Sequence, residues 1–328
     1  MTSASLLFLA AALTQAVPDT GGALYRAWCG ACHGAEGRGE SKLSTRLEVP
    51  AADLADCKIS SAEPEDRWLA IVRDGGASVG LSMDMPAYGE HASEDDLRAI
   101  VRYTRSLCGD PRWPPGELNF PRGFLTEKAF PENEVVIETR GREQEFIYER
   151  RLGPRLQLEG VARTVFDGGD VFGGFTAAAK YNVWHSVGSG ALLSAGLEVT
   201  PPVGRQALWE FEPFLAAGLM AAGLVFQAEA LGIWEETGGV TAFGLRGGVA
   251  RELGRAVPML ETGWTIPRAG GASSGALYPQ VWIQLSRLGH VAASIGAEVP
   301  LTDRATRDDR LVAFVLWDFG DGGLTRGW

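Results

Sequence analysis

Hydrophobic and polar side chains alternate one by one through much of the chain beyond residue 133. In the segments 174–184 and 190–200, one parity is apolar, and the other holds polar residues such as Lys180, Ser194 and Glu198. Alternation with a period of two predicts β-strands that have one apolar and one polar face. The apolar positions of these two segments are Phe175, Ala177, Ala179, Tyr181, Val183, Ala191, Leu193, Ala195, Leu197 and Val199.

The same alternation recurs in segments of about ten residues that are separated by Gly, Pro and Asp. These segments lie near 134–140, 145–151, 154–166, 174–184, 190–200, 209–220, 224–235, 241–251, 256–266, 276–286, 290–299 and 310–319. Leu215–Trp234 is long enough for a spanning helix, but Gln227 and Glu229 share one parity, which indicates two strands and a turn. Residues 134–328 are therefore predicted to be all-β, with about 10–12 antiparallel strands.

A soluble sheet and a membrane barrel both show this alternation, so other features must decide between them. In an up-and-down membrane barrel, the apolar face meets lipid and the polar face lines the lumen. Most of the tryptophans lie beyond residue 180, several near segment ends, where interfacial girdles place them. The polar parity is rich in Ala, Gly, Ser and Thr, as a narrow lumen requires. We predict an outer-membrane barrel and keep a soluble β-domain as the alternative.

Charged residues on the polar parity carry both signs. They are Arg155, Glu159, Arg163, Lys180, Glu198, Glu210, Glu212, Glu229, Arg246, Glu261 and Glu298. In a small barrel we expect them to form an ionic network that fills the lumen. The alternative is a path for permeation or metal ions, lined by the excess of Glu. His185 and His290 lie at segment ends, where we expect them to be solvated.

All four cysteines lie in the first third of the chain, and two of them form a motif. Cys29-Gly30-Ala31-Cys32-His33 is the C-x-x-C-H pattern of covalent c-type haem attachment. Two thiols one helical turn apart can each add to a haem vinyl group, and the adjacent imidazole then lies under the iron. A redox dithiol would not require His33, and a zinc site would need a second Cys/His pair. We predict one covalent haem c with His33 as an iron ligand.

The second axial ligand is expected from a methionine further along the chain. Met85-Pro86 follows a Gly/Ser-rich loop, residues 75–82, that is able to wrap a flat macrocycle. Pro86 fixes the backbone beside the ligand. Met83 is the competing candidate, but no proline follows it. We therefore predict that Met85 is the sulfur ligand.

Cys57 and Cys108 are left over by the haem motif. In an oxidising periplasm two spare thiols usually pair, so a disulfide between them is expected. Two buried free thiols are the alternative. Trp28 and Trp68 are expected to pack near the haem rather than to relay electrons.

The motifs of residues 20–108 together resemble class I cytochrome c. In that family, a small and an aromatic residue upstream of the haem motif meet the C-terminal helix, and Gly21 and Tyr25 occupy those places here. The resemblance implies an all-α domain, residues 17–108, in which Cys29, Cys32, His33 and Met85 hold the haem.

The C-terminal helix of this domain is readable in the sequence. Ser93-Glu94-Asp95-Asp96 is like a capping box at its start. Ile100, Tyr103 and Leu107 then recur at helical spacing. The solvated side is expected to carry Arg98, Arg102 and Arg105.

Residues 140–319 loosely resemble the small outer-membrane barrels linked to transport in phenol-degradation pathways. The resembling stretches are Gly174–Tyr181, Ser194–Gly204 and Glu212–Ala216. This resemblance implies a membrane barrel and hardly constrains the cargo. Such barrels usually end on an aromatic residue that closes the last strand, whereas Phe319 of the last predicted strand is followed here by residues 320–328. Either these residues tuck in behind the last strand, or the assembly signal is unusual.

Residues 1–16 and 109–133 lie outside the two predicted domains. The apolar run Leu6–Leu13, followed by Ala16, predicts a signal peptide over residues 1–16. Residues 109–133, which we call the strap, contain five prolines interleaved with large apolar side chains. The prolines exclude a regular helix or a central strand. We predict an extended segment that packs across one or both domains.

The net charge of −11 and the isoelectric point near 5.0 argue against nucleic acid as a partner. We predict a single-haem electron carrier of the bacterial cell envelope, tethered to outer-membrane lipid by its own barrel and serving redox proteins in the periplasm. Two axial ligands leave the iron no open position, so we do not expect an enzyme. The alternatives are an electron conduit across the outer membrane, as in cytochrome–porin fusions that oxidise extracellular iron, and a transporter barrel with a redox-sensing cytochrome domain.

Overall fold

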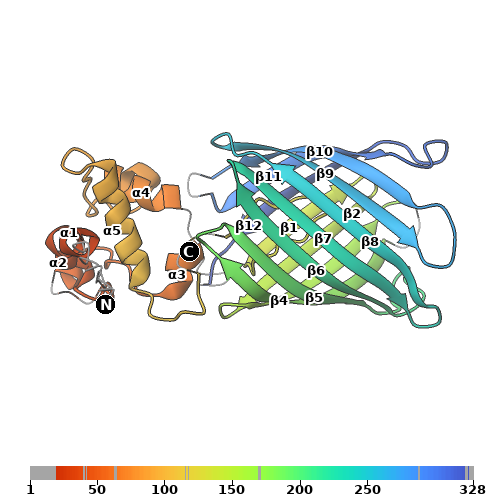
Figure 1. Ribbon diagram of the computed structural model, residues 1–328, viewed down its shortest axis with the longest axis horizontal. Helices are drawn as coiled ribbons and strands as arrows, with labels where there is room; N and C mark the ends of the chain where they lie inside the picture. Colours follow the sequence, from red (N-terminus) through yellow and green to blue (C-terminus); the bar gives the residue numbers. More distant parts are fainter. Residues whose placement is uncertain are drawn as a thin grey trace, which may run out of the picture.

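A helical N-terminal region stands at one end of a closed β-barrel (Figure 1). The computed structural model describes residues 20–39, 41, 43–62, 65–114, 116, 118–168, 171–286, 289–321 and 324. The predicted signal peptide, residues 1–16, lies outside these ranges. Among the described helices, none is both long and apolar enough to cross a membrane.

The helical region is built around the contact between its first and last helices. The helices are α1 (Thr20–Trp28), α2 (Gly30–His33), α3 (Cys57–Ala62), α4 (Glu65–Asp74) and α5 (Glu94–Ser106), with short 3₁₀ turns at Ser44–Arg46 and Gly76–Val79. α5 begins with the predicted capping box, in which Ser93 and Asp96 hydrogen-bond to each other's backbone amides. Gly21 faces the Ala99 carbonyl so closely that a Cβ there would clash with it. The Tyr25 ring packs on that of Tyr103, 5.2 Å between centroids, so both family-derived contacts are confirmed.

A disulfide joins Cys57, at the start of α3, to Cys108, just after α5. The sequence separation between the two cysteines is 51. By the chain-entropy model, a cross-link across a loop of this length stabilises the fold by about 4 kcal/mol, because it restricts the unfolded chain. The expected pairing is therefore present.

We expect the double variant Cys57→Ser/Cys108→Ser to lower the free energy of unfolding of the helical region by about 2–4 kcal/mol. Chemical denaturation of the full-length protein, followed by the helical signal in circular dichroism, measures this loss. Wild-type protein under reducing conditions is the matched control and should show the same shift. Equal stability of the oxidised and reduced forms would contradict the prediction.

The barrel has twelve antiparallel strands that pair in chain order and close by pairing β1 with β12. The strands are β1 (Glu134–Arg140), β2 (Glu143–Leu152), β3 (Leu156–Val165), β4 (Phe172–Ser186), β5 (Ala191–Thr200), β6 (Glu210–Ala221), β7 (Leu224–Glu235), β8 (Gly239–Ala250), β9 (Ala256–Pro267), β10 (Ser274–Gln284), β11 (Val291–Pro300) and β12 (Arg310–Asp318). Each lies within a few residues of a predicted segment.

The outer surface of the barrel is apolar, as the parity predicted. Leu193, Leu197 and Val281 are among many large apolar residues that the strands expose. Trp184 and Trp317 lie near one end of the barrel, whereas Trp234 and Trp264 lie toward the other. This is the distribution of two interfacial belts. Trp282 belongs to neither belt, because it lies on the inward parity of β10 and packs against the two buried clusters in the lumen.

The two ends of the barrel differ. We call the end that faces the helical region the domain-side mouth (Figure 1). It is surrounded by the connections 153–155, 187–190, 222–223, 251–255 and 285–290. Arg67 of α4 touches this mouth, with Nη1 2.9 Å from Nε2 of His290. The two longest connections, 201–209 and 301–309, lie at the opposite, loop-side mouth.

The strap enters the lumen through the domain-side mouth and turns back inside it. On the way in, Trp113 packs on Arg151 near the end of β2, and Phe120 packs on Gly218 near the end of β6. The apex is Leu125, which lies against Gly263 of β9. On the way out, the backbone amide of Glu132 donates to Oε1 of Gln157, 2.7 Å apart, at the start of β3. The strap is therefore a hairpin-shaped plug, a location that the sequence did not predict.

Apolar and polar contacts both hold the strap. Leu118, Phe120, Ala129 and Phe130 share one buried cluster with inward-facing residues of β5 to β9, and Phe124 joins a second cluster with residues of β1 to β3, β10 and β12. At the apex, Glu261 of β9 accepts hydrogen bonds from the amide of Phe124 at 2.6 Å and from the amide and hydroxyl of Thr126 at 2.9 and 2.7 Å. Because these groups are buried, their hydrogen bonds fix the path of the backbone.

The chain folds inward after the last strand. Phe319 is fully buried, and its ring stacks on Tyr148 at 5.7 Å. Asp321 binds Arg151 at 2.5 Å and accepts a hydrogen bond from the Asn133 side chain at 2.9 Å. The first residues beyond Phe319 therefore tuck in behind the strand, which was one of the two expectations. Residues 322–323 and 325–328 lie outside the described ranges.

Candidate functional site

The turn between α1 and α2 brings the motif residues together. The amide of His33 donates to the carbonyl of Cys29 at 2.9 Å, which closes one helical turn and places the two thiols and the imidazole side by side. Cys29 is buried, Cys32 is half-buried, and neither is in a disulfide. Burial, followed by the charge of Cys32, raises the pKa of Cys29 to about 11. The Cys29 thiol therefore stays protonated well above neutral pH.

His33 is oriented by a backbone acceptor. Its Nδ1 lies 3.1 Å from the carbonyl oxygen of Ala52, which fixes the proton on that nitrogen and leaves Nε2 as a lone-pair donor. Burial also lowers the pKa of His33 and so favours the neutral ring. A metal-ligating histidine commonly donates its other ring N–H to a backbone carbonyl in this way.

The loop that carries the two candidate methionines distinguishes between them. The carbonyl of Met85 accepts a hydrogen bond from the amide of Gly76 at 3.0 Å, so this part of the loop is fixed to the turn after α4. Met85 is half-buried, whereas Met83 is 86% exposed. This difference favours Met85 as the ligand.

Tyr88 joins the methionine loop to the haem motif. Its ring stacks on Trp28 with 5.2 Å between centroids, and its hydroxyl donates to the Trp28 carbonyl at 2.8 Å. Because Trp28 directly precedes Cys29, these two contacts hold the methionine loop against the turn that carries the haem motif. The expectation that Trp28 packs within the site is consistent with this contact.

One predicted surface residue is buried. Arg105 is only 3% exposed, and its guanidinium lies 5.5 Å from the centre of the Trp68 ring. The expectation that Arg105 belongs to the solvated side of α5 was therefore wrong. A long stem and a cation–π contact allow arginine to occupy such an interior position. The Nε1 donor of Trp68 is also buried and has no hydrogen-bond partner among the described residues.

These residues fit a covalent haem. The two unbonded thiols stand one turn apart, His33 keeps Nε2 available, and the Trp68 indole offers a buried donor that the described residues leave unsatisfied. Cys29 and Cys32 would hold the macrocycle, and His33 and Met85 would ligate its iron. When bound, such a group supplies a one-electron iron couple.

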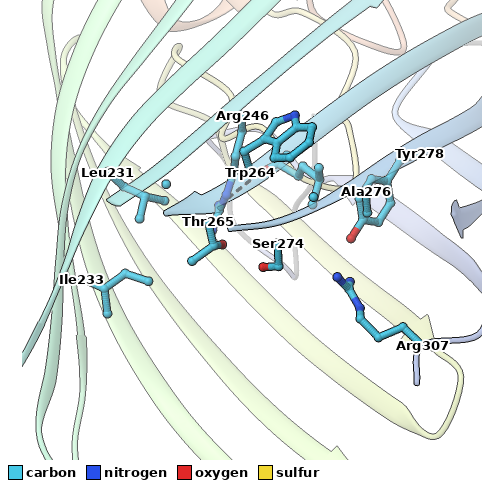
Figure 2. Close-up of a pocket in the computed structure, with 13 residues that line it drawn as sticks. Leu231, Ile233, Arg246, Trp264, Thr265, Ser274, Ala276, Tyr278 and Arg307 are labelled. Atoms are coloured by element: carbon cyan, nitrogen blue, oxygen red, sulfur yellow. Dashed lines mark hydrogen bonds between the residues drawn. The ribbon is translucent and has the colours of Figure 1, made fainter. Parts of the chain in front are cut away.

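The lumen contains the other predicted set of functional residues. Beyond the strap apex it is hollow, with cavities of about 240 and 150 Å³ that share Leu125 and Arg246 as lining residues. Figure 2 shows the smaller cavity, where Arg246 of β8, Ser274 and Tyr278 of β10 and Arg307 surround the open space. Glu159, Arg163, Glu198 and Glu212 line the larger one. The prediction that Arg155 lies on the lumen face of a strand was wrong, because Arg155 is in the turn between β2 and β3.

The two barrel histidines were predicted to be solvated, and each is only partly exposed. His185 is half-buried and bonds to the side-chain oxygen of Asn182 through Nδ1 at 2.7 Å. His290 is half-buried against Arg67 of the helical region. Segment ends were read as solvent-exposed, but one of these ends packs against the helical region.

Sequence reasoning also missed residues that hold the strap, although a signal was present. Gly263 and Gly296 interrupt the inward parity of β9 and β11, where a Cβ would lie 2.9 Å from Leu125 and 2.8 Å from Phe124. Glycine within a strand often marks the close approach of another segment. Inward-facing glycines therefore signal that some segment approaches the inner wall, but they do not identify that segment.

Structural comparison finds barrels of low similarity to this chain. The KdgM porin in complex with disordered oligogalacturonate is 10% identical, with a TM-score of 0.45, and the match covers 57% of this chain and 98% of the porin. The COG4313 outer membrane channel from Pseudomonas putida F1 is 11% identical, with a TM-score of 0.45, covering 60% of this chain and 99% of the channel. Outer membrane phospholipase A from Escherichia coli is 10% identical, with a TM-score of 0.38, covering 57% and 97%.

Sequence comparison separates the two parts of the chain. Among curated proteins, none matches it significantly. The helical region does match a family model, and the match begins before α1 and ends within α5. Residues 16–103 are similar to the family described as cytochrome c oxidase, cbb3-type, subunit III.

Proposed function

We propose that the protein is a single-haem electron carrier of the periplasm, anchored in the outer membrane by a plugged barrel. The observation that carries this proposal is the placement of the turn that contains Cys29, Cys32 and His33. α2 lies at the side of the helical region that is turned away from the barrel (Figure 1). Electrons would therefore be exchanged with a protein that docks from the periplasm, rather than passed into the lumen.

The anchoring role follows from the barrel's two surfaces. Its outer face exposes Leu, Val, Phe and Trp side chains to the surroundings, which water would disfavour and lipid would accept. Its inner face is occupied by the strap. A barrel that is filled in this way holds a domain at the membrane without providing an open pore.

Orientation follows from the connections. Outer-membrane barrels have short periplasmic turns and longer extracellular loops. The helical region adjoins the mouth with the shorter connections, and residues 201–209 and 301–309 lie at the other. This supports a periplasmic helical region. The proposal includes no catalysis at the haem, because His33 and Met85 would both ligate the iron and leave no place for a substrate.

The proposal is tested by the side from which the haem can be reduced. In intact cells, a reductant too large for porins should leave the haem oxidised, and permeabilising the outer membrane should allow full reduction. A strain that produces the protein without its haem motif, Cys29→Ala/Cys32→Ala, corrects for other cytochromes. Reduction in intact cells would instead support the electron conduit.

We expect Met85→Ala to abolish the far-red sulfur-to-iron charge-transfer band of the oxidised protein and to open the iron to added ligands such as imidazole. Met83→Ala is the matched control, because it removes an exposed methionine from the same loop. Absorption spectroscopy of both purified variants gives the answer. Loss of the band in Met83→Ala alone would show that the ligand assignment is wrong.

A further inference from the structure

Cross-strand pairing aligns carboxylates in a row along the inner wall of the barrel. Glu149 of β2 pairs with Glu159 of β3. Across β4, where Ala178 is the intervening residue, the row continues to Glu198 of β5 and Glu212 of β6. Like charges directly opposite each other on neighbouring strands are destabilising. The row therefore requires positive charge from another source.

The strap supplies part of that charge. Arg122 binds Glu149 with Nη1 2.5 Å from Oε1, and Lys128 binds Glu134, the neighbour of Glu149 on β1. The next position in the row differs. Within the described part of the chain, Glu159 has no hydrogen bond or ion pair. Direct ion pairs from the strap thus reach Glu149 but not Glu159.

At this point three carboxylates converge. Oxygen atoms of Glu127 on the strap, Glu149 and Glu159 all lie within 4.8 Å of one another. Lys180 engages Oε1 of Glu127 at 2.5 Å, and Arg122 engages Oε1 of Glu149. Glu149 is fully buried, yet its Oε2 has no hydrogen-bond partner among the described residues. A buried carboxylate oxygen left without a donor is costly and points to a missing ligand.

We propose that Glu127, Glu149 and Glu159 bind a hard divalent cation of the calcium type, which links the strap to the barrel wall. Carboxylate oxygens are the ligands that such ions prefer, and calcium accepts irregular sets completed by water. The adjoining cavity of about 240 Å³ has room for water molecules. The three carboxylates exceed the charges of Arg122 and Lys180 by one, so a cation is attracted. The site is independent of the proposed electron-transfer function.

The proposal is tested with Mn²⁺ as a spectroscopic probe for the full-length protein in lipopolysaccharide-free detergent. Electron paramagnetic resonance of free Mn²⁺ should show one ion bound per chain, and Ca²⁺ should displace it. Glu159→Gln keeps the side-chain shape and should weaken binding at least tenfold. Glu143→Gln removes the same charge from the inward face of β2 outside the cluster, and it should bind Mn²⁺ as the wild type does.

A second readout, thermal stability, keeps the test independent of whether Glu159→Gln folds well. Saturating Ca²⁺ should raise the melting temperature of the wild type by about 5–10 °C, as expected for a ligand at about a hundredfold excess over its Kd. Glu127→Gln, a change in the strap rather than in a strand, should lose this increase. Absence of stoichiometric Mn²⁺ binding by the wild type, or unchanged binding by Glu159→Gln, would overturn the proposal.

Discussion

Replacing residues 119–131 by a short Gly/Ser linker is expected to convert the barrel into an open channel. The replaced residues include Phe120, Phe124, Leu125, Ala129 and Phe130, which fill the lumen by packing on inward-facing apolar residues of the wall. Barrels of about eight strands are just filled by their own side chains, so twelve strands enclose water when nothing else fills them. Planar-bilayer recordings should show stable channel currents for the variant and none for the wild type.

A point substitution provides a sharper version of the same experiment. Glu261→Ala removes the acceptor of the apex amides, and each hydrogen bond to a charged group contributes about 1.5–3 kcal/mol. We expect frequent transient openings, because the strap remains attached but is held less firmly. Thr265→Ala alters the same inward face of β9 beyond the strap and should stay closed. Equal conductance of the wild type and the variant with residues 119–131 replaced would show that the strap does not obstruct the lumen.

The second large effect is expected on the outer face. Leu245 lies halfway along β8 and is 52% exposed. An arginine near the bilayer midplane costs about 2–4 kcal/mol, so Leu245→Arg should lower the free energy of unfolding by that amount. Leu245→Ala should change it by less than about 1 kcal/mol, because no enclosed cavity is formed. Denaturant unfolding of protein inserted in lipid vesicles measures both.

The inward-facing Leu231 of β7 is the matched control for this pair. It is 7% exposed and packs in the cluster that contains the strap, so Leu231→Ala should cost about 2–5 kcal/mol. An outer face covered by protein would reverse the order, with Leu245→Ala as costly as Leu231→Ala. Recovery of the full-length protein as a detergent-free soluble monomer would contradict the membrane assignment altogether.

The strand pattern was predictable because each strand carries its own information. In β5, Leu193 and Leu197 face outward, while Leu192 and Ser194 face the lumen. A period of two is local, so it survives without knowledge of the strand's neighbours. The haem motif is local for the same reason, since a single helical turn contains both thiols and the imidazole.

Contacts between distant segments were not predictable in this way. The charge of Arg105 predicted a solvent-exposed position on α5. Its burial depends on the packing of Trp68 beside it, which is a contact between two helices. The strap's location depends on Glu261, which is 135 or more residues away in sequence from the amides that it binds. Proline content excluded regular structure in the strap, but it contained no information about which surface would cover the apolar side chains.

Because the strap enters and leaves by the same mouth, the chain is not threaded through the ring of strands. The barrel can close β1 against β12 first and receive the strap afterwards, without separating any pair of strands. Plug and barrel are therefore separable steps of assembly. Withdrawal of the strap would break only its own contacts and would leave the ladder of backbone hydrogen bonds intact. The geometry thus permits a reversible plug in a permanent wall, a combination that a segment crossing from one mouth to the other would exclude.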